Sequence, residues 1–214
     1  MPLLLYGMTE ADSGVGLLSP GFREATVESL TEGGVRCFYS RVDELSGDAE
    51  RFRADALRFH AVLHEILDRA AVVPFRFPTL LADESGLREF LKGQASAYSV
   101  DLQRVRGMVQ MEVRIRPQPN SSCRRSGKEY MEARATEARM LTALVETARA
   151  TAGELASEWR AREETGGLRC YALVRREHIP AFEQLMRELS PVDSASILVS
   201  GPWPATEFLH VRSS

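Results

Sequence analysis

Apolar residues recur along this chain at two spacings, one typical of helices and one typical of strands. Spacings of three and four residues predict amphipathic helices over 48–70 and 83–107 and a shorter one over 179–189. Strict alternation is clearest over 109–116, so one face of that strand should be buried and the other wetted. Other short apolar runs predict strands at 3–8, 35–42, 168–175 and 194–200.

A short apolar run at residues 72–79 separates the first two helical patterns. Val73, Phe75 and Phe77 alternate with other residues, which places them on one face of a strand. Pro74 and Pro78 cannot donate hydrogen bonds to a neighbouring strand, so they mark the strand's ends or an edge strand. Arg76 should then be a single cation that projects from the opposite face, on which Pro74 and Pro78 also lie.

A third helical pattern runs from Lys128 to about Arg162, with small and apolar residues repeating close to every 3.5 positions. This spacing predicts a helical hairpin or coiled-coil-like arm over about 127–165, with Gly153 as a weak point. Taken together, the order of strands and helices predicts an α+β fold of two ferredoxin-like units, each a sheet with helices on one face. We expect the first domain to span residues 1–116 and the second, which carries the arm, residues 117–214.

Composition narrows the class of protein. The chain is 44% hydrophobic and 27% charged, as in an ordinary globular protein. Its formal net charge of −3 argues against a nucleic-acid partner. No apolar run approaches the roughly 18 residues of a membrane helix, and the apolar residues 1–8 lack a basic start, so they favour a strand over a signal peptide. Three widely spaced cysteines, Cys37, Cys123 and Cys170, favour a reducing cytoplasm over a disulfide scaffold.

Candidate chemistry is sparse. His60 and His64 share a helix face, as two zinc ligands would, but no glutamate lies between them as in a metalloprotease motif. No serine or cysteine has the surroundings of a nucleophile, so we expect no metal, no cofactor and no enzymatic activity. A basic group is interpreted as a solvated loop rather than a site for phosphate or an acidic protein surface; it comprises Arg114, Arg116, Arg124, Arg125 and Lys128. Trp203, between two prolines, is interpreted as a plug of the C-terminal core, with an exposed partner anchor as the alternative.

Several stretches, in order, resemble the GvpF/GvpL family of gas vesicle proteins along nearly the whole chain. They are Leu5–Gly7, Phe59–Leu63 followed by Val73–Phe77, Gly107 with Glu112 and Val113, Ser126–Arg134, Tyr171–Val174, and Gly201–Pro204 with Phe208. The chain departs from the family pattern at Pro78, where the family has glycine, and at Ala205–Thr206, where it has a Pro-Tyr pair.

The resemblance implies a minor, non-enzymatic gas vesicle protein, located in the cytoplasm and at the gas vesicle. It would bind the main apolar shell protein, help nucleate the vesicle, and contact other minor gas vesicle proteins. The family-motif positions that would bind partners are Arg76, Phe77, Thr79, Tyr130, Arg134, Trp203 and Phe208. Two alternatives stay open, a small-molecule-responsive regulatory module of the same fold and a divergent family member with no vesicle role.

Overall fold

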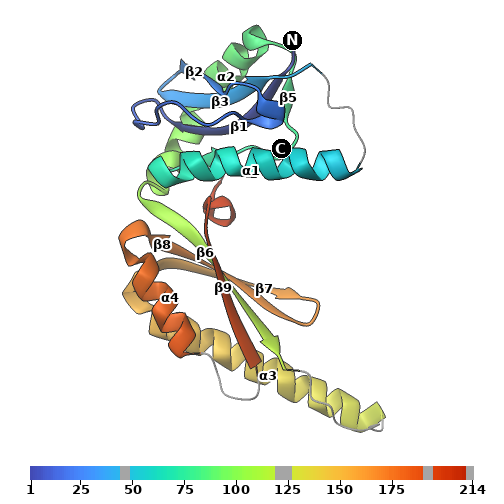
Figure 1. Cartoon of the computed structure of the whole chain (residues 1–214). Helices are drawn as coiled ribbons and strands as arrows, with labels where there is room; N and C mark the ends of the chain where they lie inside the picture. The colour runs from blue at the N-terminus through green and yellow to red at the C-terminus, as the bar shows by residue number, and fades with distance from the viewer. Residues whose placement is uncertain (44–48, 119–126, 190–194, 211–214) are drawn as a thin grey trace. The chain divides into compact units, whose positions relative to one another are not determined.

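A computed structural model describes residues 1–43, 49–118, 127–189 and 195–210. The chain forms two compact units: Met1–Gly107 joined by the segment from Pro204 onward, and Met108–Trp203 (Figure 1). This division differs from the expected boundary between residues 116 and 117. The strand at 108–117 pairs with later strands and so belongs to the second unit, whereas the C-terminal segment returns to the first.

The first unit is built on an antiparallel sheet with strand order β2-β3-β1-β4, and β5 also pairs with β1. Its strands are β1 Leu3–Glu10, β2 Glu28–Glu32, β3 Val35–Arg41, β4 Val73–Pro74 and β5 Leu80–Leu81. Its helices are α1 Ala49–Arg69 and α2 Glu84–Arg104, with short 3₁₀ turns η1 at Phe22–Glu24 and η4 at Thr206–Phe208. The helices α1 and α2 confirm the periodic patterns, while β2 lies in a stretch that showed no strand pattern.

Helices cover both faces of this first sheet (Figure 1). Alternate residues of β1 divide between them: Leu3 and Leu5 pack into a core with the apolar face of α2, while Tyr6 stacks on Phe59 of α1, with ring centroids 5.1 Å apart. The strand order and antiparallel pairing fit a ferredoxin-like unit, but the expected one-sided cover is wrong for this unit. The helix that such a unit has between its first two strands is replaced here by the irregular residues 11–27 and η1.

The second unit follows the ferredoxin-like order strand, helix, strand, strand, helix, strand. Its elements are β6 Met108–Pro117, α3 Gly127–Ala152, β7 Ala156–Glu164, β8 Gly167–Arg175, α4 Ile179–Glu188 and β9 Ala195–Trp203, with 3₁₀ turns η2 at Gly153–Leu155 and η3 at Arg176–His178. The antiparallel strand order is β7-β8-β6-β9. Both helices lie on the same side of the sheet (Figure 1), over the apolar face of β6 that the alternation predicted.

The predicted helical hairpin is wrong in its second half. The helix α3 ends at Ala152, and residues 156–164 form strand β7. Gly153 has a φ of +47°, which ends the helix, and Gly166, with a φ of +82°, lies in the turn between β7 and β8. Pairing with β8 along the whole of β7 outweighs the helical tendency of this alanine- and glutamate-containing stretch. A single helix that packs by Leu141, Val145, Ala148 and Ala152 therefore replaces the coiled-coil-like arm.

Candidate functional site

Residues 75–79 form a short irregular segment at the edge of the first sheet. They separate β4 from β5, which both pair with β1. The segment is hydrogen-bonded to β1 at both ends: the Phe75 amide donates to the Tyr6 carbonyl (2.9 Å), and the Leu5 amide donates to the Thr79 carbonyl (3.0 Å). The Thr79 hydroxyl also donates to the carbonyl of Arg76 (2.6 Å). The backbone that carries Arg76 and Phe77 is thereby held to the sheet.

The expected continuous strand is therefore wrong beyond Pro74. Because the backbone leaves the strand there, side chains no longer alternate with a period of two. Phe75 packs on the α2 side, with ring centroids 6.0 Å from Phe90 and 6.2 Å from Tyr98. Phe77 turns to the α1 side instead, so the two side chains do not share a face.

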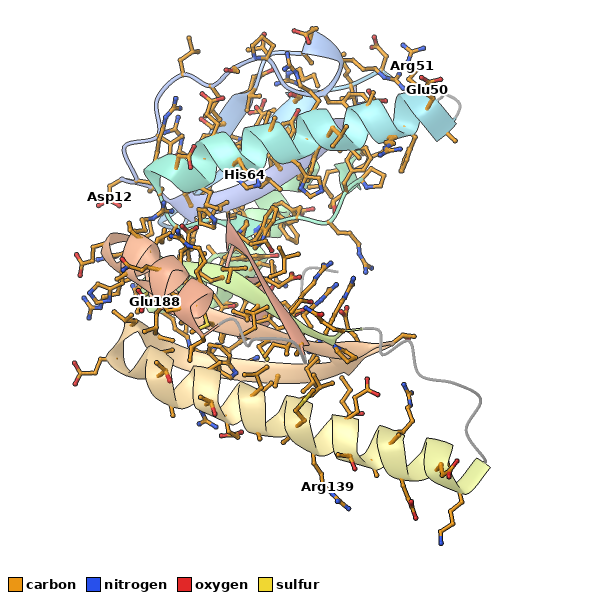
Figure 2. All side chains as sticks on the ribbon, turned by 60° about the horizontal axis from the view of Figure 1, so that its bottom comes forward. Asp12, Glu50, Arg51, His64, Arg139 and Glu188 are labelled. Carbon is orange, nitrogen blue, oxygen red and sulfur yellow. The ribbon has the colours of Figure 1, made fainter. Side chains whose placement is uncertain are left out.

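Phe77 lies among three other phenylalanines, and we call Phe22, Phe52, Phe59 and Phe77 the aromatic cluster. The ring centroid of Phe77 is 5.1 Å from that of Phe59, 5.2 Å from that of Phe52 and 6.4 Å from that of Phe22. Phe22 and Phe59 are each 1% exposed, Phe77 is half-buried and Phe52 is 48% exposed. The cluster thus runs from the core of the unit to its surface, near the N-terminal end of α1 that Glu50 and Arg51 mark in Figure 2.

A buried hydrogen-bond chain fixes the inner end of the aromatic cluster. The amide of Phe22 donates to the Tyr6 hydroxyl (2.8 Å), which lies 2.9 Å from the Ser40 hydroxyl, and Ser40 donates to the Thr26 carbonyl (2.9 Å). Since Ser40 uses its own proton on Thr26, Tyr6 must donate to Ser40. Burial raises the pKa of the Tyr6 phenol above its ordinary value, so Tyr6 keeps this proton.

Two crossed ion pairs hold η1 against α1 beside the aromatic cluster. Arg23 binds the nearly buried Asp55 through two nitrogens, at 3.1 and 3.2 Å, and Glu24 binds Arg58 at 2.7 Å. Arg23 and Glu24 both have positive φ angles, of 48° and 61°. These pairs occupy the charges of η1 within the unit, so they serve the fold.

Arg76 differs from these arginines. Its residue is exposed, and its guanidinium makes no ion pair or hydrogen bond with any residue that the structure describes. An exposed ring at Phe52, a half-buried ring at Phe77 and an unpaired cation can together bind an apolar surface that carries a carboxylate. This chemistry is that of a contact surface.

The other family-motif residues lie on other elements of the chain. Arg134 is exposed on α3 and lines a cavity of about 210 Å³ with Glu137, Glu163 and Glu164. Phe208 is fully buried and belongs to the first unit. Tyr130 lies in α3, but its side chain is outside the described residues. Three of the seven predicted positions, Arg76, Phe77 and Thr79, lie together in the segment 75–79.

Trp203 is not the core plug that the sequence suggested. It is 36% exposed at the end of β9, and its indole Nε1 donates to the Ser200 hydroxyl at 3.4 Å. The buried aromatic near the C-terminus is Phe208 instead. Two neighbouring prolines stiffen the backbone at Trp203 but carry no information on which side chain is buried.

The remaining candidate groups are structural or solvated. Among the residues that the structure describes, no group of three or more His, Cys, Asp or Glu side chains is placed to hold a metal ion. Burial raises the pKa of the Cys37 thiol well above its ordinary value and that of Cys170 to about 11, so both thiols stay protonated. In the basic group, Arg114 pairs with Glu112 and Lys128 with Glu132, while Arg124 and Arg125, like Cys123, lie outside the described residues.

Sequence reasoning missed Phe22 and Phe52. Phe52 and Phe59 are seven residues apart on α1, so their shared face was visible in the helical pattern. Phe22 lies in an irregular stretch where no periodicity operates, and its position depends on tertiary contacts such as the hydrogen bond to Tyr6. In the described ranges, no helix is both long enough and apolar enough to span a bilayer.

Comparisons with known proteins agree on one family. Residues 2–210 match the family described as gas vesicle synthesis protein GvpL/GvpF. The fold is similar to the crystal structure of the gas vesicle protein GvpF from Microcystis aeruginosa, with a TM-score of 0.79 and 15% identity over 98% of this chain and 99% of that one. It is also similar to GvpF from Anabaena sp. PCC7120, with a TM-score of 0.78 and 15% identity over 98% and 96% of the two chains. No curated protein matches. Since the family match covers nearly the whole chain, this protein belongs to the GvpL/GvpF family of gas vesicle synthesis proteins.

Proposed function

We propose that this protein is a gas vesicle assembly factor that binds the main apolar shell protein through the aromatic cluster and Arg76, and so helps nucleate the vesicle. The observation that carries the proposal is Phe52: a large ring left 48% exposed on a cluster that is otherwise packed into the fold. A gas vesicle protein family is a context in which an apolar partner is expected. The role is one of binding in the cytoplasm, where vesicles form.

The expected energy of this contact is moderate. A phenylalanine buries roughly 200 Å² when fully covered, and apolar area contributes about 25 cal/mol per Å². Covering the exposed half of Phe52 therefore contributes about 2 kcal/mol, or more than a tenfold change in Kd. Because Phe77 already supports the Phe52 ring, little side-chain entropy is lost on binding.

Arg76 adds orientation to this apolar contact. Its guanidinium is exposed and is not paired with a described residue, so a carboxylate at the edge of the partner's apolar surface can bind it without breaking an internal pair. Exposed ion pairs contribute only about 0–1 kcal/mol and weaken with salt. Arg76 should therefore affect the association rate and the salt dependence more than the limiting affinity.

The test is a pull-down of the purified shell protein, followed by a titration that measures Kd for wild type, Phe52→Ser and Arg76→Glu. Val100→Ser is the matched control, because Val100 is 60% exposed on α2, away from the aromatic cluster. We expect Phe52→Ser to weaken binding at least tenfold and Val100→Ser to leave it within twofold. Absence of shell protein capture at micromolar concentration would overturn the assembly role, and equal losses for both serine variants would overturn the placement of the site.

A further inference from the structure

The strand β9 forms one edge of the second sheet and carries no charged side chain along Ala195–Trp203. Proteins commonly protect an exposed edge strand with charges, because its free backbone groups can pair with another strand. The opposite edge follows that rule: β7 carries Glu158, Arg160, Arg162, Glu163 and Glu164. Among the described residues of the unit, no strand pairs with the outer side of β9. The β9 edge is therefore open to pairing with another strand, whereas charged side chains protect the β7 edge.

The centre of β9 is also symmetric in side-chain type. Residues Ser196–Ser200 run serine, β-branched, leucine, β-branched, serine, with Leu198 in the middle. Their pairing with β6 is regular from Ala195 to Ser200, so the strand is not distorted there. Leu198 is 61% exposed, whereas Ile197 and Val199 are half-buried on the helix side of the sheet.

We propose that β9 pairs antiparallel with β9 of a second copy of this chain, with the two-fold axis at Leu198, so that two four-stranded sheets join into one. This register places Leu198 opposite itself, Ile197 opposite Val199, and Ser196 opposite Ser200. Every opposed pair then joins like with like on the same face: leucine with leucine, β-branched with β-branched, and two serines that can hydrogen-bond. Such a contact is isologous and closes as a dimer without forming a filament.

The same operation at the other edge is unfavourable. An antiparallel pairing of β7 with itself about its central residue places Arg160 opposite Arg160, and like charges directly opposed in a sheet are destabilising. Pro202, which has no amide proton, ends the stretch of β9 that can pair. The dimer contact is thus confined to a short, uncharged part of β9.

Sedimentation velocity and light scattering of the full chain, across micromolar concentrations, test the proposal. We expect a wild-type dimer, and we expect Leu198→Lys to raise its dissociation constant at least tenfold, because two lysines then meet at the axis. Ala161→Lys is the control, since it adds the same charge on β7 and should leave the dimer intact. Far-UV circular dichroism and Tm must match wild type, so that a loss of dimer is not a loss of fold.

A disulfide cross-link tests the register of the β9–β9 pairing directly. Opposed Cα atoms in an antiparallel pair are about 4.5–5.5 Å apart, within the range of about 4.4–6.8 Å that a disulfide spans. In a Cys123→Ser background, Leu198→Cys should give a covalent dimer on mild oxidation, and Arg160→Cys should not. A monomeric wild type, or equal cross-linking of both cysteine variants, would overturn the proposal. If the wild type is monomeric and Leu198→Lys no longer binds the shell protein, the β9 edge binds that protein. This result would also overturn the proposed pairing with a second copy.

Discussion

The Tyr6 hydroxyl is a single group whose removal tests how the aromatic cluster is held. Tyr6→Phe keeps the ring that stacks on Phe59 and deletes only the oxygen between the Phe22 amide and the Ser40 hydroxyl. Tyr6 is fully buried, so water cannot replace this oxygen easily. The amide of Phe22 then becomes an unsatisfied buried donor, while Ser40 still donates to Thr26.

An unsatisfied buried donor costs about 1–3 kcal/mol, so we expect Tyr6→Phe to lower the free energy of unfolding by about 2 kcal/mol. For a chain of this size, each kcal/mol shifts Tm by about 2–4 °C. Tyr98→Phe is the matched control. Tyr98 is also buried, but its hydroxyl makes no hydrogen bond with a described residue, so its removal should change stability by less than about 0.5 kcal/mol.

Urea unfolding can report the two units separately. Both tryptophans, Trp159 and Trp203, lie in the second unit, so their fluorescence follows that unit, while far-UV circular dichroism follows the whole chain. In Tyr6→Phe, the unfolding transition measured by circular dichroism should move to a lower urea concentration, because the first unit is destabilised. If Tyr6→Phe and Tyr98→Phe unfold at the same urea concentration, the hydrogen-bond chain contributes nothing and the reasoning is refuted.

Two further predictions concern other buried groups. The carboxylate of Asp101, fully buried in α2, accepts the amide of His210 at 2.9 and 3.0 Å and lies 2.8 Å from His210 Nδ1. Asp101→Ala should therefore speed amide hydrogen exchange in residues 206–210, as mass spectrometry can measure. Unchanged exchange would show that these hydrogen bonds do not hold the C-terminal segment. Burial raises the pKa of Cys170 from 9.0 to about 11, which favours the thiol in the folded state. Stability should thus fall as pH rises from 9 toward 11, and less steeply for Cys170→Ala, as urea titrations at several pH values can check.

Individual elements differ in how well the sequence predicts them. The alternation of β6 and the periodic faces of α1 and α2 were readable, because each is a local pattern that one buried face imposes. Residues 156–164 were not, because the same composition suits a helix and only pairing with β8 selects the strand. The return of Phe208 to the first unit depends on contacts about a hundred residues apart in the chain, such as that of His210 with Asp101, which no local period encodes. Arg76 and Phe77 were identified by resemblance, and Phe52 lies on the predicted apolar face of a helix, but its contact with Phe77 is known only from the folded structure.

The two units share one strand order and differ in how their apolar surface is covered. The first has a helix on each face of its sheet, and Phe77 and Phe52 form a partly exposed aromatic surface where the edge strand breaks. The second has both helices on one face, and one of its exposed apolar residues, Leu198, lies on an uncharged edge strand. A side-chain surface can select a partner by its chemistry, whereas a free strand edge binds mainly through backbone hydrogen bonds and needs a matching register. If both proposals hold, the shared strand order supports two binding modes, recognition of an apolar partner at the first unit and pairing with a second copy at the other.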